Sequence, residues 1–130
     1  FWGCANLEKV TYTNGAGTIG FACFAECKKL KSVAIPEGIS AIDKSCFANC
    51  KKLKQINLPS TLKTIGENGF YGCTGLRTVT VKGRVTKCKI FAFYKVKNCK
   101  IILKTKAAKK SKKVFAKELK QEGNKKVKIK

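Results

Sequence analysis

Two neighbouring stretches decide the fold: IDKSCFANCKKLKQINLP at residues 42–59 and IGENGFYGCTGLRTVTV at residues 65–81. Placed one above the other at a spacing of 23 residues, they match in their apolar positions, and the same frame extends in both directions. Its columns are Phe1, Phe24, Phe47, Phe70, Phe93; Cys4, Cys27, Cys50, Cys73; Leu7, Leu30, Leu53, Leu76; Val10, Val33, Ile56, Val79, Ile102; and Ile19, Ile42, Ile65. So many columns in phase indicate an internal repeat.

A repeat of this length predicts a solenoid, because one unit cannot bury its own apolar face and stacked units share a continuous core. The end of each unit alternates apolar and polar residues, which is typical of strands, so residues 30–35, 53–58 and 76–81 are predicted to form a parallel ladder. A second short extended piece and a tight turn or one-turn helix complete each coil. The phenylalanine column is interpreted as core.

The unit Ile-Gly-x-x-x-Phe-x-x-Cys-x-x-Leu-x-x-Ile-x-Leu-Pro resembles the bacterial surface leucine-rich repeat family called BspA-like. The resemblance covers roughly residues 1–100. It implies a β-rich α/β fold, a right-handed leucine-rich repeat solenoid with the parallel strands on its concave side and short turns or one-turn helices on its convex side. It also implies a cell-surface or secreted protein that contacts host or matrix proteins, or neighbouring bacteria. The sequence departs from the repeat at residues 13–17 and 82–88. In the fifth unit Val96 replaces the cysteine of the Cys column, and Cys99 replaces the leucine of the Leu column.

The two ends depart from the repeat. The chain begins in mid-unit at Phe1, so we expect that upstream repeats have been removed and that residues 1–103 are a shortened solenoid of about four and a half coils. Residues 99–103 are a fifth strand whose register is open, because Ile101 and Leu103 are apolar as well as Ile102. Residues 104–130 are predicted to be a lysine-rich cap: a helix ending near Gly123, then a strand with Val127 and Ile129 facing inward.

The composition argues against most enzymes and most metal sites. The chain has no histidine and a single Asp, Asp43, so neither a Ser-His-Asp triad nor a Cys-His pair can be built. Zinc sites that use histidine are excluded, and no cofactor is expected. We see no signal peptide and no apolar run near the roughly 18 residues of a membrane-spanning helix.

The eight cysteines leave three alternatives open. Stacked positions lie roughly 4.8 Å apart, within reach of a disulfide, but their Cβ vectors run parallel, which is poor bridge geometry. Free buried thiols are therefore favoured over disulfides and over an all-cysteine metal site. Cys88 and Cys99 lie off the columns and are the first candidates for an exception.

The outward positions of the predicted strands are the candidate binding face, because solenoids use extended concave surfaces for partners. These residues are Lys9, Thr11, Ser32, Ala34, Gln55, Asn57, Thr78 and Thr80. They form a small, mostly neutral polar surface, beside a basic edge made of Lys28, Lys29, Lys31, Lys51, Lys52 and Lys54. Plain solvent exposure is the alternative interpretation.

Charge is the other strong signal, at a formal net value of +22. Residues 82–130 hold nineteen bases and two acids, against ten and five in residues 1–81. The candidate polyanion contacts are Lys109, Lys110, Lys112, Lys113, Lys125 and Lys126. Specific nucleic-acid binding is disfavoured, because only two bases are Arg. In addition, no aromatic side chain interleaves with the lysines at 109–113 as a stacking platform, apart from Phe115, which is placed in the core.

Three functions remain. The first is a non-enzymatic protein-interaction or adhesion module that uses the concave face. The second is a basic anchor that binds anionic wall polymers or glycans, and the third is an accessory repeat domain of a larger enzyme. Salt dependence separates the first two, because contacts to a linear polyanion weaken steeply with ionic strength.

Overall fold

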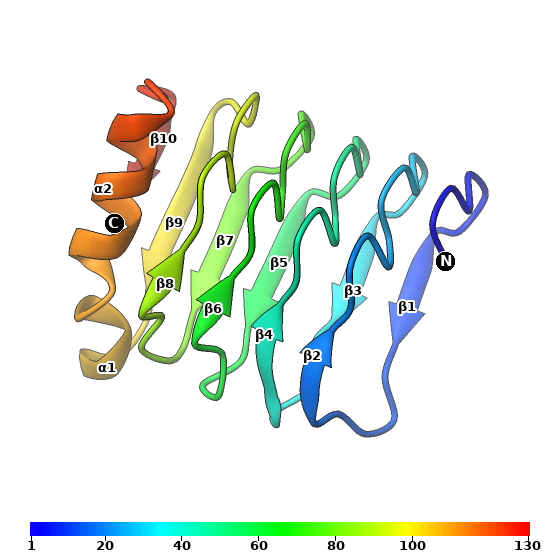
Figure 1. Ribbon diagram of the computed structural model, residues 1–130, viewed down its shortest axis with the longest axis horizontal. Coiled ribbons are helices and arrows are strands. Elements are labelled where there is room, and N and C mark those ends of the chain that lie inside the picture. Colours follow the sequence, from blue (N-terminus) through cyan, green and yellow to red (C-terminus); the bar gives the residue numbers. More distant parts are fainter.

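The computed structural model describes all 130 residues as one stack of coils closed at the C-terminal end by helices (Figure 1). Each of the first four coils contributes one strand to each of two parallel sheets. The longer sheet has the order β1-β3-β5-β7-β9-β10, and the shorter has the order β2-β4-β6-β8. The strands of the longer sheet are β1 (Lys9–Thr11), β3 (Ser32–Ala34), β5 (Gln55–Leu58), β7 (Thr78–Val81), β9 (Cys99–Leu103) and β10 (Val127–Ile129). The shorter sheet has β2 (Gly17–Ile19), β4 (Ile39–Ile42), β6 (Thr64–Ile65) and β8 (Lys87–Cys88).

The repeat predicted from the sequence is confirmed by the register. Val10 is the partner of Val33, and Ile56 is the partner of Val79, so equivalent residues of successive units lie side by side. The second extended pieces form their own ladder, Ile42 to Ile65 for example, which the sequence did not predict as a sheet. The solenoid therefore has two laddered sides around one core.

The phenylalanine column forms the centre of that core. Successive rings from Phe1 to Phe93 stack at centroid distances of 5.4–5.5 Å, and all but Phe1 are buried. Such stacking adds to the large apolar area that each ring buries. The last ring, Phe93, meets Phe115 of the cap at 6.1 Å, so the cap continues the column.

The turns between the sheets are tight because two positions in each coil take the left-handed conformation. Ala22, Ser45, Asn68 and Phe91 occupy one of these columns, with φ between 50° and 60°. The backbone of each turn then bonds to the next coil, as in Phe47 N–H to Gly69 O at 2.9 Å. These intercoil bonds offset the cost of positive φ in residues other than glycine.

The fifth coil settles the register that the sequence left open. Ile101, not Ile102, is the partner of Val79, so the spacing shortens to 22 residues and Ile102 turns outward. The prediction that placed Ile102 in the apolar column with Val79 was therefore wrong, because Ile101 takes that place. Cys99, Ile101 and Leu103 face the core in strict alternation, which is the pattern of a regular strand.

The cap differs in one respect from the single helix predicted for residues 104–123. It contains two helices, α1 (Lys106–Lys109) and α2 (Lys112–Gln121), because the chain turns at the buried Ser111. Ala108, Phe115 and Leu119 pack on the core. The strand β10 follows and pairs with β9 in parallel, with Val127 facing inward as predicted. None of the helices has the length and apolar character needed to cross a membrane.

Candidate functional site

The eight predicted face residues lie together on the outward side of the longer sheet. In one row Lys9 pairs with Ser32, and Gln55 pairs with Thr78. In the other, Thr11 pairs with Ala34, which in turn pairs with Asn57, and Asn57 with Thr80. Five of the eight are exposed, whereas Ser32, Thr78 and Thr80 are half-buried. The structure thus gathers them on one continuous surface.

The outward face extends into residues that the sequence did not single out. Lys100 is the partner of Thr78, and Lys128 is the partner of Lys100, so the first row ends in two lysines. Ile102 extends the second row beside Thr80. The alternation at residues 126–130 indicated an edge strand, but only the parallel pairing of β10 with β9 reveals that the lysines line up.

Hydrogen bonding differs between the two sheets. On the shorter sheet's side, the hydroxyls of Ser40, Thr61 and Thr86 donate to backbone carbonyls of the preceding coil. The threonines of the longer sheet's outward face make no bond of this kind. Their hydroxyls, with the amides of Gln55 and Asn57, are available to an external partner.

The basic edge beside this face is partly neutralised in the first coils. Lys31 pairs with Glu8 at 2.8 Å and Lys28 with Glu26 at 3.9 Å, and Lys29 donates to Asn6. The remaining lysines of that edge, Lys51, Lys52 and Lys54, are exposed. Positive charge beside the face therefore increases toward the later coils.

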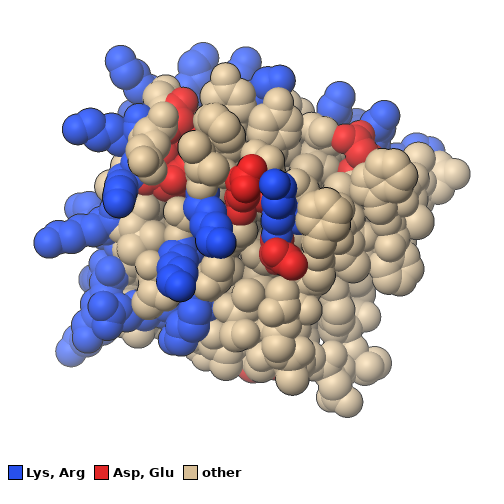
Figure 2. All heavy atoms as spheres, viewed as in Figure 1, with Lys and Arg blue, Asp and Glu red and all other residues tan.

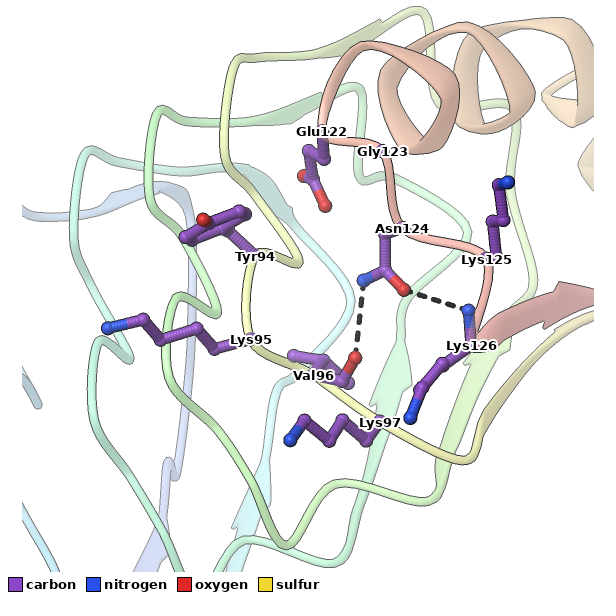
Figure 3. A pocket seen from close by; sticks show the side chains of 9 residues that line it. All are labelled: Tyr94, Lys95, Val96, Lys97, Glu122, Gly123, Asn124, Lys125 and Lys126. Carbon is purple, nitrogen blue, oxygen red and sulfur yellow. Dashed lines mark hydrogen bonds between the residues drawn. The ribbon is translucent and has the colours of Figure 1, made fainter.

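The six lysines predicted to contact polyanions form two groups rather than one patch. Lys109, Lys110, Lys112 and Lys113 surround the junction of α1 and α2, where Lys109 and Lys112 line a hollow of about 260 Å³. Lys125 and Lys126 lie beyond the other end of α2 and line a hollow of about 370 Å³ (Figure 3). A ten-residue helix separates the groups by about 15 Å.

Both acidic residues of the basic half are buried in the contact between α2 and the last coil. Glu118 accepts the Phe91 N–H at 2.8 Å and Glu122 accepts the Phe93 N–H at 2.9 Å. In the earlier coils the equivalent N–H groups donate to backbone carbonyls of the next coil, as Phe70 N–H does to Ala92 O. In the last coil the two carboxylates take the place of those carbonyls. Burial raises the pKa of both carboxyls, that of Glu122 to about 7. The surface of this half is therefore almost purely cationic, and Figure 2 shows lysine and arginine gathered over the cap end.

An exposed aromatic cluster was missed by the sequence analysis. Tyr71 and Tyr94 stack at 5.8 Å, Phe91 lies 5.2 Å from Tyr94, and the Lys95 amine lies 5.2 Å from the Tyr71 ring centre. Hydrogen bonding to Tyr71 raises the pKa of Lys95. The signal was present, because Tyr71 and Tyr94 are one period apart. Tyr94 also lines the hollow that contains Lys125 and Lys126, whereas no aromatic side chain lines the hollow beside Lys109 and Lys112.

All eight cysteines are free thiols, Cys88 and Cys99 included. In the main column, the Cys50 Sγ–H donates to Phe24 O and the Cys73 Sγ–H donates to Phe47 O, each at 3.0 Å. Burial raises the pKa of Cys46, Cys73, Cys88 and Cys99, that of Cys99 to about 11. The five buried thiols, Cys27, Cys46, Cys50, Cys73 and Cys99, are therefore structural groups of the core.

Parallel strands repeated every 23 residues around a stacked apolar column define a leucine-rich repeat solenoid. The sequence matches the family model for the BspA type leucine rich repeat region (6 copies) over residues 1–121, so the chain belongs to the BspA-type leucine-rich repeat family. The match extends the resemblance beyond residue 100 and into the cap. No match was found among curated proteins or among solved structures.

Proposed function

We propose that the chain is a non-enzymatic protein-interaction module of a cell-surface or secreted protein, and that its partner binds the outward face of the longer sheet. The observation that carries the proposal is the unbonded polar surface formed by Gln55, Asn57, Thr78 and Thr80 at the centre of a six-stranded sheet. A preformed, rigid face with free donors and acceptors costs little ordering entropy on binding.

The charge distribution supports an orientation for this partner. The neutral centre of the face passes into Lys100 and Lys128 at the cap end, without a carboxylate beside them. Electrostatic complementarity of this kind mainly raises association rates and fixes register. An acidic patch on the partner would lie over β9 and β10, with adhesion as the biological outcome.

The test is binding of the chain to a panel of purified extracellular-matrix proteins by surface plasmon resonance at 150 mM NaCl. The blocking variant Asn57→Tyr/Thr80→Tyr adds bulk but no charge to the face. The matched control Thr18→Tyr/Ser40→Tyr adds the same bulk to β2 and β4 on the other side. Binding that only the first variant abolishes supports the proposal. Binding to no member of the panel, or equal loss with both variants, contradicts it.

A second candidate function is a basic anchor for anionic polymers or glycans. The observation that favours it is the burial of Glu118 and Glu122, which leaves the nineteen bases of residues 82–130 without an exposed acid among them. Truncation after Leu103 would remove the groups that hold Phe91 and Phe93, so charge substitution is the better probe.

The anchor function is tested by heparin binding of the intact chain between 50 and 500 mM NaCl. Because ionic contacts release counterions, affinity should fall steeply over this range. Binding that is absent at 50 mM, or unchanged by salt, would exclude the anchor. The same titration on the face variant Asn57→Tyr/Thr80→Tyr should be unaffected, which separates the two functions.

A further inference from the structure

The start of the last two strands forms a cationic trough that neither the repeat nor the basic helix accounts for. Two hollows of about 370 and 410 Å³ adjoin there and share Lys125 and Lys126 as a common wall. We define the trough by Lys97, Asn98, Lys100, Lys125, Lys126 and Lys128. In Figure 3 the side chains of Lys97 and Lys126 reach the same lower rim of the first hollow.

The trough holds several positive charges close together, and their repulsion destabilises the fold when no ligand is bound. Lys100 and Lys128 are direct register partners on neighbouring parallel strands, which lie about 4.8 Å apart. Like charges opposite each other in a sheet are destabilising. All three ion pairs of the molecule lie in residues 8–67, so no carboxylate offsets this repulsion.

The one acidic residue that lines the trough does not neutralise it. Glu122 lies on the inner wall, one of its oxygens accepts the Phe93 N–H, and the other is buried. Asn124 also faces the backbone: its amide donates to the carbonyls of Phe93 and Val96 and its oxygen accepts the Lys126 N–H (Figure 3). These contacts make the wall rigid and leave the lysine amines free at the rim.

The chemistry of the trough fits a chain of spaced anionic groups. Lysine amines act as strongly hydrated point charges that suit sulfate and carboxylate groups, whereas arginine is the usual bidentate reader of bases. Tyr94 is the one aromatic ring that lines the two hollows, and it packs against Tyr71 and Phe91. The trough therefore lacks the series of stacking platforms on which a single-stranded nucleic acid places successive bases. The exposed side chain of Asn98 adds an amide that can bond to hydroxyls.

We infer that the trough binds a linear sulfated or uronate-bearing polysaccharide, with the ligand's anionic groups between Lys97, Lys100, Lys126 and Lys128. This inference rests on the second candidate function and places its ligand on the β9–β10 edge rather than on the lysines of the helices. Binding relieves the Lys100–Lys128 repulsion, so the ligand should stabilise the fold as well as attach to it.

The experiment uses heparin as the probe and compares two triple variants of the full chain by calorimetric titration at 100 mM NaCl. Lys100→Gln/Lys126→Gln/Lys128→Gln removes trough charge, and Lys109→Gln/Lys112→Gln/Lys113→Gln removes the same charge from the helices. We expect the trough variant to lose at least about tenfold in affinity and the helix variant less than about threefold, because only the trough contacts are lost. Thermal melting without heparin should show the trough variant at least as stable as the wild type.

Each remaining outcome overturns the inference in a distinguishable way. If both triple variants lose affinity equally, total charge alone attracts heparin and the trough is not a site. If only the helix variant loses affinity, the anchor function stands and its place on the molecule is wrong. If the wild type does not bind heparin, the anchor function fails with the inference. If single-stranded DNA of matched charge binds the trough more tightly than heparin, the ligand class is nucleic acid.

Discussion

At the scale of single residues, the cysteines of the repeat column bond through their thiols to backbone carbonyls of the preceding coil. Cys50 is fully buried and its Sγ–H donates to Phe24 O, which also accepts the Cys27 N–H. We expect Cys50→Ala to lower the free energy of unfolding by about 1–2 kcal/mol, through a small cavity and a lost weak bond. Cys50→Val should cost less than half of that, because buried Val96 fills the equivalent position in the fifth coil.

Urea denaturation of the three proteins measures this difference, with Cys4→Ala as the control. Cys4 is exposed, so its substitution should change the free energy of unfolding by less than about 0.5 kcal/mol. An equal decrease in the free energy of unfolding for Cys4→Ala and Cys50→Ala would show that the buried Cys50 contact does not stabilise the fold.

Glu122 gives the fold a pH dependence of predictable sign. Burial raises its pKa from 4.5 to about 7, with the nearby Glu118 adding to the rise. Between these values the folded state binds more protons at Glu122 than the unfolded state does. The contribution of Glu122 to stability is therefore fully present below about pH 4.5 and is lost as the pH rises to 7. Glu118, whose pKa is also raised, contributes in the same direction.

Glu122→Gln isolates the contribution of Glu122. The glutamine amide keeps an acceptor for the Phe93 N–H and stays neutral, so the variant should approach the wild type in stability at pH 4 and exceed it by an increasing margin up to pH 8. Denaturant unfolding of the wild type and of Glu122→Gln, measured from pH 4 to pH 8, gives the pH dependence of the free energy of unfolding for each protein. A wild-type stability that rises over this range would refute the assignment.

At the scale of elements, the cap depends on a serine that interrupts its helix. The Ser111 side chain is buried and its Oγ accepts the Val85 N–H of the fourth coil at 2.9 Å. Ser111→Ala should lower the free energy of unfolding by about 1–3 kcal/mol, because a buried N–H loses its partner. Thermal or urea unfolding measures the loss. Ala116→Ser, an exposed change in α2, is the control and should cost less than about 0.5 kcal/mol.

The same serine shows why sequence patterns recovered some elements and missed others. The Phe and Cys columns and the strand at residues 127–129 follow from periodicity, which the structure confirms. The break at Ser111 depends on a tertiary bond that no local pattern contains. Ile101 displaced Ile102 because one residue is lost from the spacing, and such a slip exchanges the two faces of a strand. The second sheet was missed because β6 and β8 are only two residues long.

At the scale of the whole molecule, the candidate face was predictable and the trough was not. Residues such as Gln55 and Thr78 sit at fixed repeat offsets, so the frame alone places them side by side. Lys100 and Lys128 are 28 residues apart and meet only because the cap folds back and adds a strand to β9. Charge counts located the basic half, but the burial of its two acids, which sharpens the asymmetry, required the structure.

A net charge of +22 on a chain of this size predicts that folding is opposed by self-repulsion. Raising NaCl from 20 to 500 mM should therefore stabilise the protein, since the Debye length falls from roughly 20 Å to about 4 Å. A gain of about 1 kcal/mol corresponds to a rise of roughly 4 °C in Tm for a domain of this length. Differential scanning calorimetry in both salts measures it. The variant Lys109→Gln/Lys112→Gln/Lys113→Gln, with less repulsion to screen, should show a shallower increase. A Tm that stays constant or falls with salt would mean that the exposed lysines are spaced widely enough for water alone to screen them.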